Sequence, residues 1–112
     1  TNDVIAWVGG RDRASSELDR VRQAVREVGS TIKPLLASVG LEARSLTPAS
    51  IFPSSDNVAL TLRRGLARSD NQVARAMVDA VGFSQLDARL GDFGLDTTLP
   101  HDSTLAMGNV AL

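Results

Sequence analysis

Apolar residues recur at helical spacing through much of the chain after residue 30. The clearest stripe predicts a helix over residues 71–81 that stops at Gly82, because its members lie three and four positions apart: Val73, Ala74, Met77, Val78 and Val81. The same spacing predicts helices over residues 30–39 and 83–93, with Gly40 and Gly94 as their caps.

Two further segments complete the expected order of elements. Residues 58–67 return to helical periodicity, with Ser55 or Asp56 as the expected cap, and the preceding residues 46–57 are rich in proline and serine and predict a loop. The residues after Pro100 predict a turn and a short helix.

The N-terminal part has a different pattern. Residues 4–8 are apolar and partly β-branched, and they end at Gly9, so they predict one mostly buried strand. Most of the chain after Gly29 is expected to be helical, so this strand has no evident partner in the chain. Residues 16–28 carry apolar positions among charges, and both a helix and an extended arm remain open.

Composition narrows the classes of protein. A length of 112 residues fits one small domain or a piece of a larger one. The net charge is −1, and dispersed arginines with few aromatic residues argue against a nucleic-acid surface. Cysteine is absent, which excludes disulfides and thiolate metal sites, and the single His101 is expected in a loop and not at a metal. No apolar run reaches the roughly 18 residues of a membrane span.

The single lysine of the chain follows a serine at the spacing of one helical turn. Ser30 and Lys33 lie three residues apart, which puts them on one face of a helix, and Pro34 favours a helix start near Ser30. A lysine amine can lose its proton when it is desolvated, whereas arginine stays charged. The pair has the geometry of a serine nucleophile with Lys33 as its base, but the spacing alone is a weak motif, and a capping serine with a solvated lysine fits it as well.

A second group of polar residues lies between two expected helices. Ser69, Asp70 and Asn71 could hold a hydroxyl and an amide over a cleft, but serine and aspartate are also favoured helix caps. Ser55, Asp56 and Asn57 repeat the same tripeptide. One of the two copies is expected to be only a cap.

Six segments in order resemble the first part of the transpeptidase domain of bifunctional, class A penicillin-binding proteins. They are V-G-G-R-D at residues 8–12, G-S-T-I-K-P at 29–34, L-T-P-A at 46–49, T-L-R-R-G-L-A-R-S-D-N at 61–71, L-P at 99–100 and S-T-L-A-M-G at 103–108. The resemblance makes Ser69, and not Ser55, the serine of the second motif.

The resemblance implies an α+β fold of the penicillin-binding and serine β-lactamase type, of which residues 1–112 would be the mainly helical part with one N-terminal strand. It implies Ser30 as the acylated nucleophile, Lys33 as its base, Ser69 as a proton relay and Asn71 as a substrate contact. No cofactor and no metal are implied. The expected partners are peptidoglycan stem peptides, β-lactam antibiotics and the remainder of the same domain, on the extracytoplasmic side of a bacterial inner membrane.

Two departures from the family pattern leave alternatives open. The K-T-G strand is absent, because Lys33 is the single lysine, and the loop expected between Ile51 and Val58 is missing or short. The expected function is a part of a peptidoglycan D,D-transpeptidase that forms an acyl-serine. A D,D-carboxypeptidase or serine β-lactamase shares the two serine motifs, and a catalytically degenerate helical docking module fits the missing strand.

Overall fold

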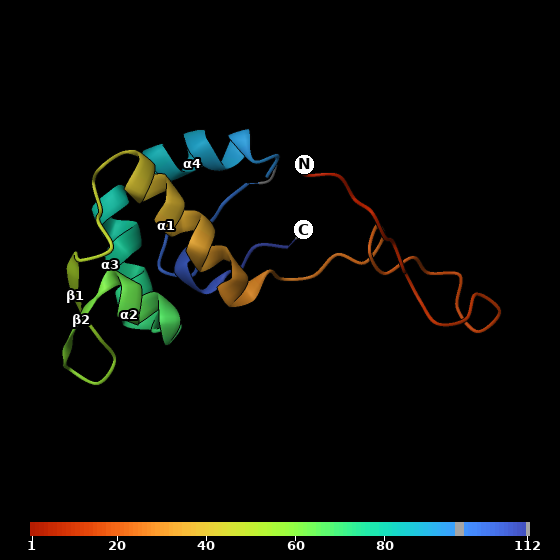
Figure 1. Ribbon diagram of the computed structural model, residues 1–112, viewed down its shortest axis with the longest axis horizontal. Coiled ribbons are helices and arrows are strands. Elements are labelled where there is room, and N and C mark those ends of the chain that lie inside the picture. The colour runs from red at the N-terminus through yellow and green to blue at the C-terminus, as the bar shows by residue number, and fades with distance from the viewer. Residues whose placement is uncertain (96–97, 112) are drawn as a thin grey trace.

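The computed structural model describes residues 1–95 and 98–111, in which a helical body carries a long N-terminal arm (Figure 1). The body begins at the 3₁₀ turn η1 (Gly29–Ile32), which leads into α1 (Lys33–Glu42). The remaining elements, in chain order, are β1 (Ile51–Pro53), β2 (Ala59–Thr61), α2 (Leu62–Ala67), α3 (Asn71–Val81), α4 (Phe83–Asp92) and η2 (Leu105–Met107). No helix among the described residues is both long and apolar enough to cross a membrane.

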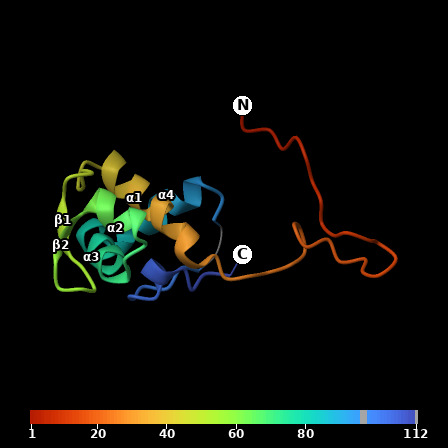
Figure 2. The same ribbon diagram turned by 60° about the horizontal axis from the view of Figure 1, so that its bottom comes forward.

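The core lies between α1, α3 and α4, and η2 packs against α3 (Figure 2). Side chains from these four elements are completely buried in one cluster, which includes Leu36, Met77, Leu86, Leu90 and Leu105. Burial of aliphatic side chains of this size typically contributes about 1.5–3 kcal/mol each. The predicted helices over residues 71–81 and 83–93 are thereby confirmed, the second to within one residue.

Helix α1 begins and ends about three residues later than its sequence predicted. It continues through Gly40 to Glu42, so the expected cap at Gly40 is wrong. Gly40 is buried, and a Cβ atom at this position would lie 2.4 Å from the Leu46 side chain and 2.7 Å from that of Val81. The glycine therefore allows a close approach of α1 to the core instead of ending the helix.

A β-hairpin replaces part of an expected loop and part of an expected helix. Strands β1 and β2 are antiparallel, with Phe52 opposite Leu60. The helix predicted over 58–67 begins only at Leu62, and Thr61 caps it by accepting a hydrogen bond from the Arg64 N–H. The prediction of Ser55 or Asp56 as the cap is therefore wrong, because both lie in the turn of the hairpin.

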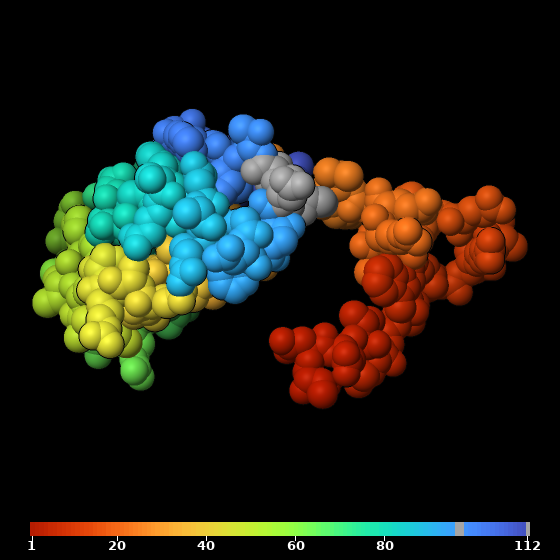
Figure 3. All heavy atoms as spheres, turned by 90° about the horizontal axis from the view of Figure 1, so that it is seen from above, coloured from red at the N-terminus to blue at the C-terminus, as the bar shows by residue number. Residues whose placement is uncertain are grey.

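The arm comprises residues 1–28 and projects away from the helical body (Figure 3). Residues 4–8 are extended but form no strand, and the prediction of a buried strand is wrong: Val4, Ile5, Trp7 and Val8 are 52–96% exposed. A strand requires a neighbour for its backbone groups, and no described segment forms backbone hydrogen bonds with residues 4–8, although the Trp7 indole N–H donates to the Asp19 carboxylate. For residues 16–28, the structure has an extended arm with short turns and not a helix.

Candidate active site

Lys33 is buried at the start of α1, although lysine side chains are normally exposed. The residue is only 2% exposed, and at the end of η1 its N–H donates a hydrogen bond to the Ser30 carbonyl. Pro34 occupies the first turn, where its missing N–H removes no helical hydrogen bond. The ammonium group therefore lies inside the body, where it needs acceptors to offset the loss of water.

The Lys33 amine has three acceptors, which come from the turn between α2 and α3 and from the first residue of α3. Nζ donates to the Ser69 carbonyl at 2.8 Å, to the Ser69 hydroxyl at 3.1 Å and to Asn71 Oδ1 at 2.7 Å. An ammonium has three N–H donors, so the group is fully satisfied. Three of the four predicted site residues are thus in direct contact across 36 to 38 positions of sequence.

Burial and a neighbouring charge have opposite effects on the pKa of the Lys33 amine. Burial lowers the pKa of Lys33 below its ordinary value, and the negative charge of Asp70 partly raises it again. The net result is a lowered pKa, which increases the fraction of neutral amine at a given pH. A neutral amine can accept a proton, as a general base must.

The turn that presents Ser69 and Asn71 has an unusual backbone. Ser69 adopts a left-handed conformation with φ +53° after the end of α2, and the Asp70 N–H donates to the Gly65 carbonyl at 2.9 Å. The Asp70 carboxylate then caps α3 by accepting hydrogen bonds from the N–H groups of Gln72 and Val73 at 2.9 and 3.0 Å. Asp70 thus satisfies the cap, while its two neighbours contact Lys33.

The first copy of the tripeptide contacts the second. The Ser55 N–H lies 3.1 Å from an Asp70 carboxylate oxygen, and the Ser55 hydroxyl donates to the same carboxylate at 3.2 Å. Together with the α3 cap, led by the Val73 N–H, these hydrogen bonds lower the pKa of the Asp70 carboxyl. Sequence reasoning missed this contact, because nothing in a tripeptide repeat indicates that its two copies meet.

Ser30 lies in η1 and is exposed. Among the described residues, its hydroxyl has no side-chain hydrogen bond, and none joins it to the Lys33 amine. Gly29 precedes it with φ +56°, a left-handed angle that glycine adopts without strain and that turns the chain sharply before this serine. The structure therefore groups Lys33 with Ser69 and Asn71, and leaves Ser30 open to solvent at the beginning of the same helical segment.

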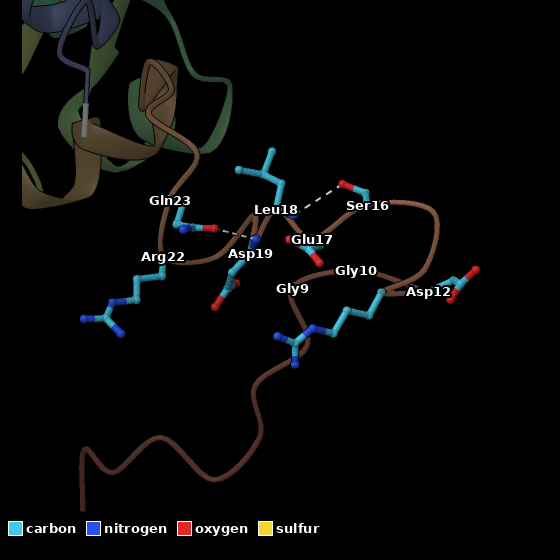
Figure 4. Close-up of a pocket in the computed structure, with 10 residues that line it drawn as sticks. Gly9, Gly10, Asp12, Ser16, Glu17, Leu18, Asp19, Arg22 and Gln23 are labelled. Carbon is cyan, nitrogen blue, oxygen red and sulfur yellow. Dashed lines mark hydrogen bonds between the residues drawn. The ribbon is translucent and has the colours of Figure 1, made fainter.

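Two other features lie away from this group. His101 pairs with Asp87 at 2.6 Å and stacks on Phe83, and the described residues contain no cluster that could hold a metal ion. A hollow in the arm forms where the chain folds back and the Gln23 side chain accepts from the Asp19 N–H (Figure 4). None of the four predicted site residues lines this hollow.

The chain has clear relatives of known name. It is 32% identical to penicillin-binding protein 2D of Bacillus subtilis over 130 residues, which covers 96% of this chain and 19% of the relative. It is 34% identical to penicillin-binding protein 1A of Aquifex aeolicus over 131 residues, or 98% of this chain and 18% of the relative. This chain is similar to penicillin-binding proteins. No model of a known protein family matches it.

A solved structure extends the likeness to three dimensions. Penicillin-binding protein 1A from Haemophilus influenzae matches 94% of this chain with a TM-score of 0.84 and 25% sequence identity, over 19% of its own chain. The α+β fold of part of a penicillin-binding protein is therefore confirmed. The chain spans less than a fifth of these relatives, and its 130-residue match to the Bacillus protein exceeds its own 112 residues, so that relative has residues without a counterpart here.

Proposed function

We propose that this chain is part of a peptidoglycan D,D-transpeptidase, a cell-wall enzyme that cross-links stem peptides through an acyl-serine and is acylated by β-lactams. The observation that carries the proposal is the buried Lys33 amine, which Ser69 and Asn71 hold at hydrogen-bond distance. Support also comes from the names of the relatives, which are penicillin-binding proteins over nearly all of this chain.

In the proposed reaction, the Ser30 hydroxyl attacks the carbonyl between two terminal D-alanines, and the neutral Lys33 amine takes the hydroxyl proton. The peptide C–N bond breaks, the departing D-alanine amine takes up a proton, and the peptide becomes an ester of Ser30. An amine of a second stem peptide then displaces the serine and forms the cross-link. A β-lactam ring opens on Ser30 in the same way and leaves a stable ester.

The Ser69 side chain suits a proton relay because it is a hydroxyl, which can both donate and accept a hydrogen bond, beside the Lys33 amine. Of the three acceptors around Nζ, two are carbonyl oxygens, of Ser69 and of the Asn71 side chain, and they can only accept. The Ser69 hydroxyl can also donate, so it can pass a proton between Lys33 and a leaving group. Asn71 uses its Oδ1 atom on Lys33, which leaves its amide N–H groups for a substrate carbonyl.

The arm is the basis of the domain proposal. Residues 1–112 would be the part of a transpeptidase domain that carries the two serine motifs, without the K-T-G strand. The exposed side chains of Val4, Ile5, Trp7 and Val8 would then pack against the remainder of the domain, since an extended apolar segment gains by pairing with a sheet. The parent protein would act on the extracytoplasmic side of a bacterial inner membrane.

The test is acyl transfer by the full-length protein from a peptide that ends in D-alanyl-D-alanine, with an amine acceptor present. We expect release of D-alanine with a new amide product, and loss of both in Ser30→Ala. Release with hydrolysis alone would favour a D,D-carboxypeptidase. Absence of release and of β-lactam binding would favour a helical docking module instead.

A further inference from the structure

Gly29 and Gly108 make a close backbone contact that has no role in the proposed reaction as described above. The Gly29 N–H donates a hydrogen bond to the Gly108 carbonyl at 3.1 Å. Gly108 has φ +76°, and a Cβ atom on it would lie 1.9 Å from the Gly29 carbonyl oxygen and 2.5 Å from the Gly29 Cα atom. Both the backbone angle and the contact therefore require glycine at position 108.

The segment that carries Gly108 is anchored in the core. Gly108 caps η2, whose residues Leu105 and Ala106 are completely buried, and its N–H donates to the Leu105 carbonyl at 3.1 Å. Beyond it, the Val110 carbonyl accepts a hydrogen bond from the Val28 N–H at 3.0 Å. Figure 1 shows this dark blue segment beside the orange start of α1. A buried segment of the body thus supports the backbone immediately before Ser30.

The two reacting groups of the proposed mechanism are held from different sides. Lys33 Nζ is bound to the turn between α2 and α3, through Ser69 and Asn71. The backbone before Ser30 is bound to the segment after η2, through Gly108. A displacement of the second support would therefore move the Ser30 hydroxyl while the Lys33 amine stayed in place.

We propose that Gly108 is a positioning residue for acylation, which sets the place of Ser30 relative to the Lys33 amine; this rests on the proposed function of Ser30 as nucleophile. Ordinary contact begins at about 3.4 Å, so a methyl group at position 108 forces the Gly29 carbonyl away by more than ~1 Å. A misplacement of that size costs a reaction on the order of 10²-fold in rate.

The chain offers a matched control in Gly94. Its φ of +79° is nearly that of Gly108, but among the described residues no atom would lie within 4 Å of a Cβ atom there. Gly94→Ala therefore introduces the same backbone strain without the contact. The experiment measures labelling of the full-length protein by a fluorescent penicillin over time, at several penicillin concentrations, for the wild type, Gly108→Ala and Gly94→Ala.

For Gly108→Ala we expect a limiting acylation rate lower by on the order of 10²-fold, a half-saturating concentration within a few-fold of wild type, and complete labelling at long times. Complete labelling distinguishes a displaced nucleophile from unfolded protein, which would lower the final level instead. Gly94→Ala should acylate at nearly the wild-type rate. Equal rates for the two alanine variants would overturn the role of Gly108.

A second variant and a second measurement test the role of Gly108 if Gly108→Ala does not fold or the wild type is not labelled. If Gly108→Ala does not fold, Val110→Ala replaces it, since truncation of this buried side chain loosens the same support; an unchanged acylation rate in Val110→Ala would overturn the proposal. If the wild type is not labelled at all, the proposed function itself fails. Hydrogen exchange then reports on the contact alone, because the Gly29 amide should exchange faster in Gly108→Ala than in Gly94→Ala.

Discussion

Lys33 is the residue on which the proposed chemistry depends, because it is a buried amine with a lowered pKa and a complete set of acceptors. Burial of an ammonium costs free energy that hydrogen bonds only partly return. A residue that served only as a structural cation would gain nothing from a lowered pKa, whereas a base gains a larger neutral fraction.

The first prediction is that Lys33→Arg loses acylation almost as fully as Lys33→Ala. Arginine keeps the positive charge but cannot be neutral near pH 7, and loss of a general base costs on the order of 10²- to 10⁴-fold in rate. Second-order rates of acylation by a penicillin measure the loss, and thermal melts of both variants control for folding. Retention of most of the rate in Lys33→Arg would mean that the lysine acts as a fixed charge.

The second prediction concerns Asp70, whose charge raises the pKa of Lys33 against the effect of burial. Asp70→Asn removes the charge but keeps a residue that caps helices well. The pKa of Lys33 should then fall further, so the loss of acylation on acidification should begin at a lower pH than in the wild type.

Asp56→Asn is the matched control, because Asp56 occupies the same place in the first tripeptide and is exposed. The pH dependence of the acylation rate should not change in this variant. A shift of the Asp70→Asn profile towards higher pH, or an equal shift in both variants, would contradict the electrostatic role of Asp70.

At the scale of elements, the turn between α2 and α3 and the hairpin turn share one tripeptide but differ in what they contact. Ser69→Ala removes a partner of Lys33 and should slow acylation by about 10²-fold or more with the fold intact. Ser55→Ala removes one exposed hydrogen bond to Asp70 and should cost about 0.5–1.5 kcal/mol or less of stability, with acylation near normal. Acylation rates and thermal melts of both variants separate an effect on acylation from an effect on stability. Equal rate losses would contradict the assignment of Ser69, and not Ser55, as the serine that takes part in acylation.

The approach of α2 to α3 supports a fourth prediction. A Cβ atom on Gly65 would lie 2.4 Å from the Val73 side chain, so Gly65→Ala should force the two helices apart and destabilise the protein by about 1–3 kcal/mol. In α4, no atom of the part of the chain that the structure describes would lie within 4 Å of a Cβ atom on Gly91, so Gly91→Ala should stabilise by up to about 1 kcal/mol. Denaturant unfolding of both variants measures the difference, and stabilisation by Gly65→Ala would contradict the packing described.

Local sequence predicted the elements that depend on local interactions. Helix α3 was predictable because its apolar stripe and the cap at Asp70 lie within one short segment. The hairpin was not, because β1 ends at Pro53 and each strand has only three residues, too few to show an alternating pattern. The apolar residues 4–8 have the composition of a strand, but pairing depends on a neighbour that sequence pattern does not reveal.

In the candidate site, too, local contacts were predictable from sequence and distant contacts were not. The spacing of Ser30 and Lys33 predicts that they lie one turn apart, and the structure has them in consecutive elements. The hydrogen bonds of the lysine amine, however, go to Ser69 and Asn71 and not to the Ser30 hydroxyl. The contact of Lys33 with Ser69 joins residues 36 positions apart, and only the family resemblance indicated it. Nothing in the sequence pattern indicated the contact of Gly29 with Gly108, since a glycine has no side chain whose type would suggest a partner.

At the scale of the whole molecule, the chain is a helical body with an arm whose apolar side chains are exposed, and it spans less than a fifth of its relatives. These two facts agree with the proposal that residues 1–112 belong to a larger transpeptidase domain. In that proposed domain, Ser30 would be the nucleophile.

The most direct test is the position of the covalent adduct after treatment of the full-length protein with a penicillin. Peptide mapping by mass spectrometry should find one adduct, on Ser30, in the wild type and none in Ser30→Ala. Location of the adduct on Ser69 or on another serine, or undiminished labelling in Ser30→Ala, would show that Ser30 is not the nucleophile.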